Sequence, residues 1–497
     1  MPLPDSLFTS ACSARRKTGV ACAVAVGLIA LTFYLATLAP GLTWAYDSAD
    51  GGELAAAART LGIPHPPGYP TYVLLAHLFT YLPVGEVATR TNLLSAVCAA
   101  GTAAILAWTL ARATRNWCAA LGAGLALAFS PLLWHQAVVT EVHTLNALFT
   151  ALLLILAVYV SAAPPGTSGG NRTLAMALGA TWGLSLGNHL TALFCAPLVI
   201  LALWRLGRCG LWGMGGVVLG LLVYLYLPLR AAAEPPVNWG DPRTLARFWW
   251  MVSGGPYHQF VFSLPQAHLA QRLLAWLNLL ARQFGWIGLP VLACGIAALS
   301  ALDPPLLGAT AATVTLCSGF AIGYDTTDSY LYLIPSLVCL GLWLGLGLDL
   351  LLEALSARPR WAWGAGALAI LLPLAAGIWR VPTVDLSDDR AADTFKTAIL
   401  APAPPKAILL SQEDGSTFAL WYFQYGLGYR QDVVVIDLDL LGYEWYVAQI
   451  ARQLLVSPPV EALRSGEVEK LEQVSKILER TVCWVASERT ELSCVEP

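Results

Sequence analysis

Charged residues are scarce in this 497-residue chain. They make up 12% of it, whereas 57% of residues are hydrophobic and the mean hydropathy is +0.63. A soluble domain carries about 25% charged residues, so this shortage and the long apolar runs predict a polytopic membrane protein. The net charge of −3 gives no support to a nucleic-acid partner. Lysine is absent between Lys17 and Lys396, which is explained either by compositional bias or by a use of arginine in phosphate recognition.

Cysteine patterns typical of metal sites are also absent. No CxxC or mixed His/Cys cluster indicates zinc, and the carboxylates show no ligand spacing, so no cofactor is assigned and a divalent cation is left open. Most cysteines lie in apolar segments and are interpreted as small core residues. Cys483 and Cys494 lie in the polar C-terminal part, where they can pair if that part faces an oxidising compartment.

The apolar runs predict about eleven membrane-spanning helices. The basic residues at 15–17 place the N-terminus in the cytoplasm, and five inner segments carry Arg or Lys while most acids fall on the outer side. The inner turn at Asp303 has no base and is an exception; the stretch 162–172 is predicted as another inner loop. Residues 69–82 are predicted as an interfacial or re-entrant segment, and 268–282 as an amphipathic helix on the membrane. The predicted spans are 20–38, 91–110, 117–133, 144–160, 174–186, 190–204, 211–227, 284–299, 306–322, 331–352 and 361–378.

From residue 380 onward the composition changes to that of a small α/β domain. Strands are predicted at 407–411 and 432–437, and helices at 417–425, 443–455 and 468–480. Alternating strands and helices indicate a parallel sheet. We therefore expect a mainly α fold with two domains. They are a membrane helical bundle (1–379, with a first outer loop at 39–90 and a long outer loop at 230–282) and an extracytoplasmic α/β domain (380–497).

Three carboxylates follow the first apolar run and form an acidic island. Asp50 and Glu53 are three residues apart, so at the start of a helix they share one face. One interpretation is structural, with Asp50 as N-cap and Glu53 in the first turn. It does not account for Asp47. The other interpretation is catalytic, with a carboxylate acting as general base for a hydroxyl nucleophile or as part of a metal site.

Other polar residues are predicted to lie at the same outer end of the bundle. The proline-rich turn at 65–70 is either a rigid connection or an anion-binding loop. Ionisable groups at the membrane boundary are candidates for function, and outer arginines are candidates for holding a lipid-linked phosphate, although snorkelling to lipid headgroups is the alternative for each. The candidate binding residues are His65, Tyr69, Glu141, His143, Asn146, Asn188, His189, Arg230, Asp241, Arg243, Arg247, His258 and Asp325.

Several motifs resemble one family. The sequences DGGEL at 50–54 and LGIPHPPGYP at 61–70 resemble the signature of the transmembrane O-mannosyltransferases acting on plexin-type receptors and of their bacterial relatives. TEVHTLNALF at 140–149, GLSLGNHLT at 183–191, NWGDPRT at 238–244 and DVVVIDLDLL at 432–441 resemble it too. This family is similar to the GT-C glycosyltransferases, which use a polyprenyl- or dolichyl-phosphate sugar and an acidic residue in the first outer loop.

The resemblance implies an inverting transfer of a sugar such as mannose, from a polyprenyl-phosphate donor to a hydroxyl of a protein or glycan acceptor outside the cytoplasmic membrane. By motif position Asp50 matches the expected base and Glu53 its partner. Gly51 stands where the signature usually has Ser, and with Asp47 nearby the base is either Asp47 or Asp50. The rival hypotheses are a transporter or flippase of lipid-linked sugars without catalysis, and a scaffold whose outer domain binds a partner.

Overall fold

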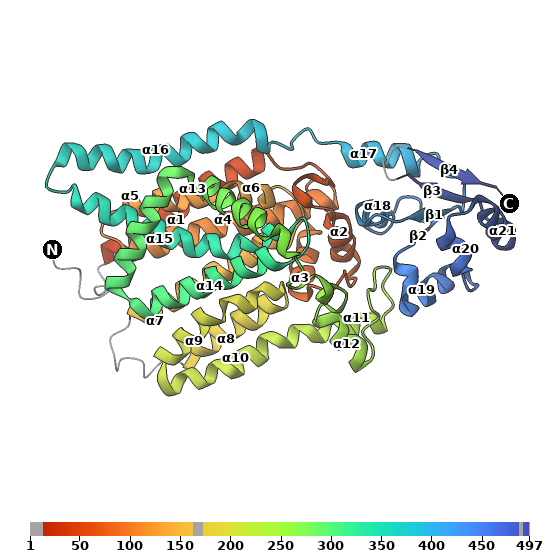
Figure 1. Cartoon of the computed structure of the whole chain (residues 1–497), viewed down its shortest axis with the longest axis horizontal. Helices are drawn as coiled ribbons and strands as arrows, with labels where there is room; N and C mark the ends of the chain where they lie inside the picture. Colours follow the sequence, from red (N-terminus) through yellow and green to blue (C-terminus); the bar gives the residue numbers. More distant parts are fainter. Residues whose placement is uncertain (1–12, 163–171, 487–490, 497) are drawn as a thin grey trace.

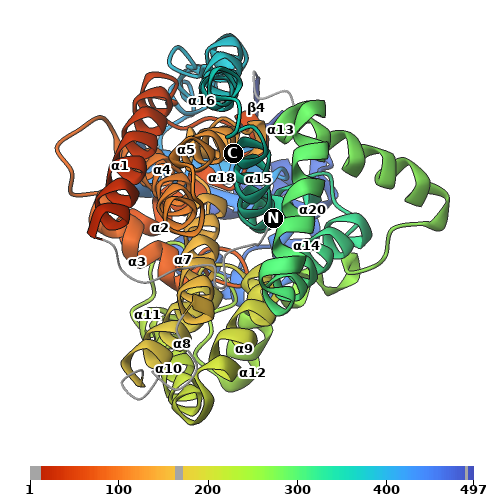
Figure 2. The ribbon, with the colours of Figure 1, turned by 90° about the vertical axis from the view of Figure 1, so that its left-hand side faces the viewer.

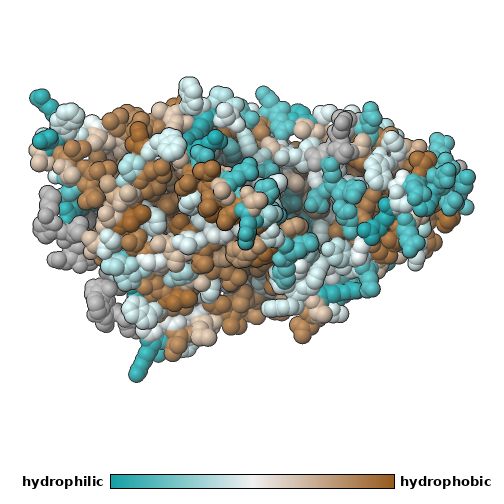
Figure 3. All heavy atoms as spheres, viewed as in Figure 1, coloured by the Kyte–Doolittle hydropathy of each residue, from teal (hydrophilic) through white to brown (hydrophobic). Residues whose placement is uncertain are grey.

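The computed structural model describes residues 13–162, 172–486 and 491–496. The N-terminal tail and most of the inner loop predicted at 162–172 lie outside the described residues. Figure 1 shows a long bundle of helices with a smaller region, containing a sheet, against one end. The surface is largely apolar over the bundle and more hydrophilic over the C-terminal region (Figure 3).

All eleven predicted apolar segments coincide with helical structure. Among the described residues, eight helices are long and apolar enough to span a membrane, and the pair α5 and α6, bent by 61°, is either a ninth, broken span or a re-entrant loop. The other two predicted spans fall on α8 and on the apolar helical stretch Leu190–Arg205, which are shorter. The bundle helices are α1 (Ser13–Ala36), α4 (Val87–Ala113), α5 (Trp117–Ala128), α6 (Pro131–Ala137), α7 (His143–Ala162), α8 (Arg172–Leu186), α9 (Ala196–Arg205), α10 (Trp212–Leu221), α11 (Tyr226–Ala232), α13 (Gln266–Leu302), α14 (Pro304–Gly323), α15 (Ile334–Ala354) and α16 (Pro359–Val384).

Helix α15 lies at the centre of the bundle and α16 at its edge. In the span that contains α15, 89% of the apolar stretch is buried, against 11% in α16. Figure 2, which looks along the bundle, shows α15 surrounded by other helices. The predicted helix at 268–282 forms the first part of α13, and a backbone break at Gly285, where φ is 72°, separates it from the apolar remainder of that helix.

Helices α8 and α10 pack with their backbones in close contact. A Cβ built on Gly179 would lie 2.0 Å from the carbonyl oxygen of Gly213, and one on Gly216 would lie 2.2 Å from that of Met176. Glycines spaced four residues apart let membrane helices approach this closely. Both views show α8, α9 and α10 grouped along one side of the bundle (Figures 1 and 2).

Short elements link the longer helices of the bundle. The predicted helix after the acidic island is α2, which is buried and rich in alanine, and the predicted interfacial segment contains α3. These connecting elements are η1 (Ala45–Asp47), α2 (Gly51–Thr60), α3 (Pro70–Phe79), η3 (Leu190–Cys195), η4 (Gly207–Leu211), η5 (Leu222–Leu225), α12 (Leu245–Val252), η6 (Gly255–Phe260) and η7 (Ser329–Leu333).

The C-terminal region contains a four-stranded sheet in the order β2-β1-β3-β4. Strand β1 pairs in parallel with β2, as predicted for alternating strands and helices, and also with β3. Strands β3 and β4 were not predicted, and β4 returns antiparallel to β3. Cys483 and Cys494 face each other across β3 and β4 and form a disulfide. The elements are α17 (Ala391–Phe395), η8 (Lys396–Leu400), β1 (Ile408–Ser411), α18 (Asp414–Trp421), η9 (Tyr422–Gly426), β2 (Val434–Asp437), η10 (Leu440–Gly442), α19 (Glu444–Leu454), α20 (Val460–Ser465), α21 (Val468–Leu478), β3 (Val482–Val485) and β4 (Leu492–Val495).

Acidic residues at the end of the bundle away from the sheet are paired with arginines. The side chain of Arg205 donates to both oxygens of Asp303, at 2.7 and 2.6 Å. The turn at Asp303, which has no basic residue nearby in the sequence, therefore has Arg205 as its partner in the folded chain. Arg115 pairs in the same way with Glu353 at 2.9 Å.

Candidate functional site

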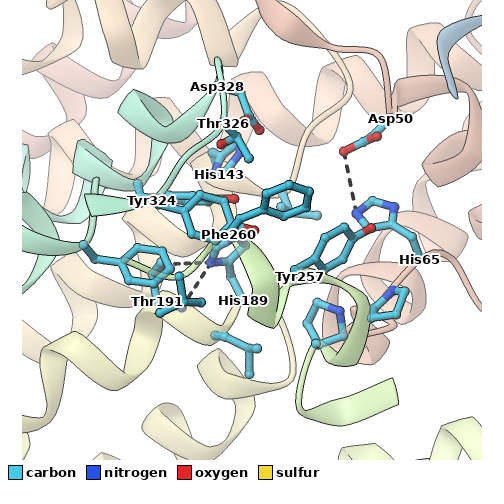
Figure 4. Close-up of a pocket in the computed structure, with 18 of the residues that line it drawn as sticks. Asp50, His65, His143, His189, Thr191, Tyr257, Phe260, Tyr324, Thr326 and Asp328 are labelled. Atoms are coloured by element: carbon cyan, nitrogen blue, oxygen red, sulfur yellow. Dashed lines mark hydrogen bonds and ion pairs between the residues drawn. The ribbon is translucent and has the colours of Figure 1, made fainter. Parts of the chain in front are cut away.

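A cavity of about 820 Å³ lies where the bundle meets the C-terminal region. Its walls come from the loop before α2, the turn at 65–69, η3, η6, α14 and α18. Of the predicted site residues, Asp47, Asp50, His65, Tyr69, Glu141, His143, His189 and His258 line it. Figure 4 shows Asp50 and His65 together on one side of the cavity, and His189 with Thr191 on the other.

The Asp50 carboxylate faces the cavity. Asp50 immediately precedes α2, but its side chain makes no capping hydrogen bond with the helix. The carboxylate is 38% exposed and its Oδ2 lies 3.6 Å from His65 Nε2. Burial raises the pKa of Asp50, the charge on His65 lowers it, and the charge on Asp328 raises it. The structural interpretation as a side-chain N-cap is therefore wrong, and the carboxylate is left available to a ligand.

His65 is held between Asp50 and a buried glutamate. Glu53 is fully buried, and its Oε2 accepts hydrogen bonds from His65 Nδ1 at 2.6 Å and from the His65 backbone N–H at 3.1 Å. His65 Nε2 lies 2.8 Å from the Tyr69 hydroxyl. Burial lowers the pKa of His65, but Asp50 and Glu53 outweigh it and raise the pKa to about 10. His65 is therefore an imidazolium at neutral pH, and Glu53 acts behind it without lining the cavity.

Two further histidines and a buried glutamate also line the cavity. The backbone N–H of Thr191 donates to His189 Nδ1 at 3.2 Å, which leaves Nε2 of His189 as the protonated nitrogen. His143 lies beside it, with ring centroids 5.3 Å apart. Glu141 is 3% exposed, and its Oε1 has no hydrogen-bond partner.

Asn146 and Asn188 lie behind these residues without lining the cavity. Asn146 donates to the Thr191 hydroxyl at 2.8 Å, and Asn188 donates to the carbonyl of Val142 at 3.2 Å. Both side chains are buried. The structure therefore places these two candidate binding residues as supports for the loop that carries His189 and for the start of α7.

The two remaining acidic candidates near the cavity differ from Asp50 in their partners. Asp47 lines the cavity, but its Oδ2 accepts a hydrogen bond from the Tyr330 hydroxyl. Asp325 is not part of the lining; its carboxylate lies 4.0 Å from Arg272. In the same turn it is Asp328 that lines the cavity.

The outer arginines are engaged away from the cavity. Arg230 donates to the backbone carbonyls of Leu61 and Thr60, at 2.7 and 3.2 Å. Arg243 and Arg247 both donate to Asp241, at 2.7 and 2.8 Å. No Arg or Lys is among the lining residues that the structure describes. The arginines that the sequence suggested for a phosphate are thus not brought to the cavity, whereas the imidazole of His258 is at its edge, with Nε2 donating to the Ser253 carbonyl at 2.8 Å.

Two lining residues, Asp414 and Phe418, were missed because they come from the start of α18, in the C-terminal region. No local motif marks them, because they reach the cavity through the docking of one region on another. The Phe418 ring stacks on His65 with an interplanar angle of 9°. Burial and the charge on Asp50 raise the pKa of Asp414 to about 7.

One end of the cavity is apolar. Leu193 and Phe194 of η3 face Leu316, Gly319 and Phe320 of α14 there. Leu193 is 50% exposed and Leu316 is 45% exposed, on helices in the apolar part of the bundle. The cavity thus joins a polar end beside Asp50 to an apolar end that can receive a hydrocarbon chain. In the described part of the chain, no three or more His, Cys, Asp or Glu side chains are grouped so as to hold a metal ion.

The helical bundle and its cavity define a GT-C-type fold. The chain superposes on the crystal structure of ArnT from Cupriavidus metallidurans in the apo state with a TM-score of 0.56, covering 94% of this chain and 93% of that one at 14% identity. The same protein bound to undecaprenyl phosphate gives 0.52, with 87% and 92% covered at 15% identity. The Archaeoglobus fulgidus oligosaccharyltransferase complex with Zn and sulfate gives 0.53, with 93% and 67% covered at 11% identity. At these identities the likeness shows the fold alone.

Sequence comparison is more specific and confirms the resemblance found in the motifs. Residues 50–208 match the family described as Protein O-mannosyl-transferase TMEM260 N-terminal domain, and residues 392–475 match TMEM260-associated domain 2. The Protein O-mannosyl-transferase TMEM260 of Mus musculus is 29% identical over 446 residues, or 82% of this chain and 61% of that protein. The Dictyostelium discoideum protein is 25% identical over 304 residues, 56% and 36% of the two chains. The chain thus spans about three fifths, or less, of the length of these relatives.

Proposed function

We propose that this chain is an inverting membrane glycosyltransferase that moves a hexose, mannose by analogy with its relatives, from a polyprenyl-phosphate donor to an acceptor hydroxyl. The observation that carries the proposal is the Asp50 carboxylate, uncapped and open to the cavity beside a cationic His65. The GT-C-type fold and the relatives named as protein O-mannosyl-transferases support it. The acceptor is then a hydroxyl of a protein.

Asp50 acts as general base in this mechanism. Its carboxylate accepts the proton of the acceptor hydroxyl as the oxygen attacks the anomeric carbon, while the bond from that carbon to the phosphate oxygen breaks. Burial makes Asp50 a stronger base than an exposed aspartate, and His65 keeps it ionised. Glu53 fixes the orientation and charge of His65 through its 2.6 Å hydrogen bond. Asp47 is disfavoured as the base because the Tyr330 hydroxyl occupies it.

The departing phosphate lies on the opposite side of the sugar from the base, as inversion requires. On that side of the cavity His189 presents its protonated Nε2, and His143 lies next to it. Hydrogen-bond donors aimed at developing negative charge stabilise such a transition state. The isoprenoid chain of the donor fits the apolar end between η3 and α14.

We place this site on the extracytoplasmic face of the cell membrane. The Cys483–Cys494 disulfide in the C-terminal region supports this orientation, because disulfides persist in oxidising compartments. Arginines such as Arg112 and Arg115 fall at the opposite end of the bundle, as expected for cytoplasmic loops. A cysteine-accessibility experiment with a membrane-impermeant reagent on intact cells tests it: a cysteine introduced at exposed Lys476 is labelled in this orientation and protected in the reverse one.

The proposed activity is tested by incubating the full chain, in lipid nanodiscs, with radiolabelled undecaprenyl-phosphate mannose and a blocked threonine-rich peptide. Labelled peptide is expected from the wild type and not from Asp50→Asn. A transporter without chemistry would move the lipid and leave the peptide unlabelled. Equal labelling by wild type and Asp50→Asn would exclude Asp50 as the base.

A further inference from the structure

The C-terminal region supplies one wall of the cavity. Helix α18 begins directly after β1, at the carboxyl end of that strand, and its first residue is Asp414. Asp414 and Phe418 line the same cavity as Asp50 and His65. Two parts of the chain about 350 residues apart thus meet around one ligand-sized space.

This meeting is fixed by close packing on the acidic motif itself. A Cβ on Gly52 would lie 2.5 Å from the Phe418 carbonyl oxygen and 2.6 Å from its carbon, so only glycine lets α18 approach α2 this closely. The indole N–H of Trp44 donates to the Gly415 carbonyl at 2.9 Å. The Phe418 ring stacks on His65. Three contacts therefore hold the start of α18 against the loop that carries Asp50.

The carboxylates of Asp414 and Asp437 differ in their hydrogen bonds. Asp437 accepts from the Thr417 hydroxyl at 2.7 Å and from the backbone N–H groups of Asp439 and Leu440, both at 2.9 Å. None of the hydrogen bonds found in the described residues uses the Asp414 side chain, which is exposed to the cavity. An open carboxylate in a cavity wall is suited to N–H or O–H donors of a ligand.

The position of Asp414 relates it to the acceptor rather than to the lipid donor. The acceptor hydroxyl has to approach Asp50. Asp414 is close enough to Asp50, His65 and Glu53 for their charges to shift its pKa. The isoprenoid chain requires the apolar end, which is lined from η3 and α14. The wall that α18 provides lies in the part of the chain outside the membrane spans, from which a polypeptide can enter.

Resting on the function proposed above, we propose that Asp414 is an acceptor-binding residue, whose carboxylate accepts hydrogen bonds from the backbone or side-chain N–H groups of a polypeptide acceptor. Gly52 permits this contribution by letting α18 dock on α2. The C-terminal region is then part of the substrate site. Acceptor selection is set jointly by the bundle and by α18.

The kinetic test uses the full chain in nanodiscs, undecaprenyl-phosphate mannose and the blocked threonine-rich peptide. Loss of a hydrogen bond to a charged group predicts that Asp414→Asn raises the peptide KM about tenfold or more, with kcat lowered less than about threefold. Asp414→Glu should recover a KM within about threefold of wild type. Asp439→Asn, on the same edge of the sheet and outside the cavity lining, is the matched control. An unchanged KM in Asp414→Asn, or a loss confined to kcat, overturns the assignment.

A second measurement tests the docking without turnover. Hydrogen exchange of residues 414–421 should be slow in the wild type and at least about tenfold faster in Gly52→Ala, while Gly442→Ala, where a Cβ meets nothing within 4 Å, stays as wild type. Unchanged exchange in Gly52→Ala overturns the docking. If the wild type neither transfers mannose to the peptide nor releases free mannose by transfer to water, the proposed function is overturned, and the acceptor role with it. A labelling wild type with an unchanged KM in Asp414→Asn overturns the acceptor role alone.

Discussion

The Asp50 cluster and the Asp241 cluster are both built from carboxylates and cations, yet they are used differently. Asp241 accepts hydrogen bonds from Arg243 and Arg247, and Arg243 also pairs with Glu234 at 3.2 Å. Asp50 lies 3.6 Å from His65 with no capping bond and faces the cavity. The first cluster closes on itself, whereas the second leaves a carboxylate free for a ligand.

This difference shows that the type of residue in a motif does not identify a site. Both clusters come from motifs that stand out in the sequence, DGGEL with HPPGYP and NWGDPRT. What separates them is whether each acceptor and donor is already satisfied within the protein. Asp241 is 6% exposed, and both of its carboxylate oxygens are paired with guanidinium groups. Its role is therefore to stabilise the conformation of the loop.

The largest difference between the clusters should appear on neutralising the two aspartates. Asp50→Asn removes the proposed base and should lower the transfer rate by about 10²–10⁴-fold. Asp241→Asn should lower it by less than about threefold, since no ligand contact is lost. Initial rates with undecaprenyl-phosphate mannose and the peptide measure both. Similar losses in the two variants would remove the distinction drawn here.

Neutralising Glu53 should have the next largest effect. Glu53→Gln keeps the shape of the side chain but removes the buried charge that holds the pKa of His65 near 10. His65 then loses its proton more readily and no longer supports the ionised form of Asp50, so the rate at neutral pH should fall about tenfold or more. Rates between pH 5 and pH 9, with circular dichroism as a control for folding, test this. An unchanged rate would show that Glu53 is only structural.

The pH dependence should move in opposite directions in two variants. His65→Asn removes a charge that lowers the pKa of Asp50, so the acid limb of the pH–rate profile should move to higher pH, by about one unit. Asp328→Asn removes a charge that raises the same pKa, so the limb should move to lower pH. The profile of kcat/KM measures both shifts. Shifts of the same sign would mean that another group titrates.

The smallest effect is expected in the closed cluster. Arg243→Gln and Arg247→Gln remove ion pairs whose guanidinium side chains are 40% and 41% exposed. An ion pair with so exposed a guanidinium group contributes about 1 kcal/mol or less, each variant leaves the other arginine on the buried Asp241, and neither arginine reaches the cavity. Thermal unfolding and transfer rates should therefore stay close to wild type. A rate loss above about tenfold in either variant would restore the arginines as phosphate ligands.

Much of the fold could be predicted because apolar runs are visible in the local sequence and indicate helices directly. Each apolar run coincides with helical structure, and strands β1 and β2 lie where the β-branched runs predicted them. The helix predicted at 268–282 is present as the first part of α13, but its angle to the apolar remainder, set by the break at Gly285, could not be predicted from the sequence. The base for Asp303 was equally hidden, since Arg205 lies 98 positions earlier in the sequence.

The lining of the candidate site could be predicted where one motif contained it, and it was missed where two regions had to meet. Asp50, His65 and Tyr69 come from one continuous stretch, and the structure brings them together. Asp414 and Phe418 carry no local signal. The only sequence feature that permits α18 to reach the cavity is the glycine at position 52, which leaves room for the Phe418 backbone. That role of Gly52 can be recognised only when α2 and α18 are seen together in the structure.

The glycine contact between α8 and α10 bears on how the cavity is entered. With carbonyl oxygens where a Cβ would be, at Gly179, Gly183, Gly216 and Gly220, the two helices interlock and cannot shear past each other. Segment η3 begins four residues after α8 ends and carries Leu193 and Phe194 at the apolar mouth. A widening of that mouth for the chain of the proposed lipid donor would therefore require α8 and α10 to move together as one rigid unit.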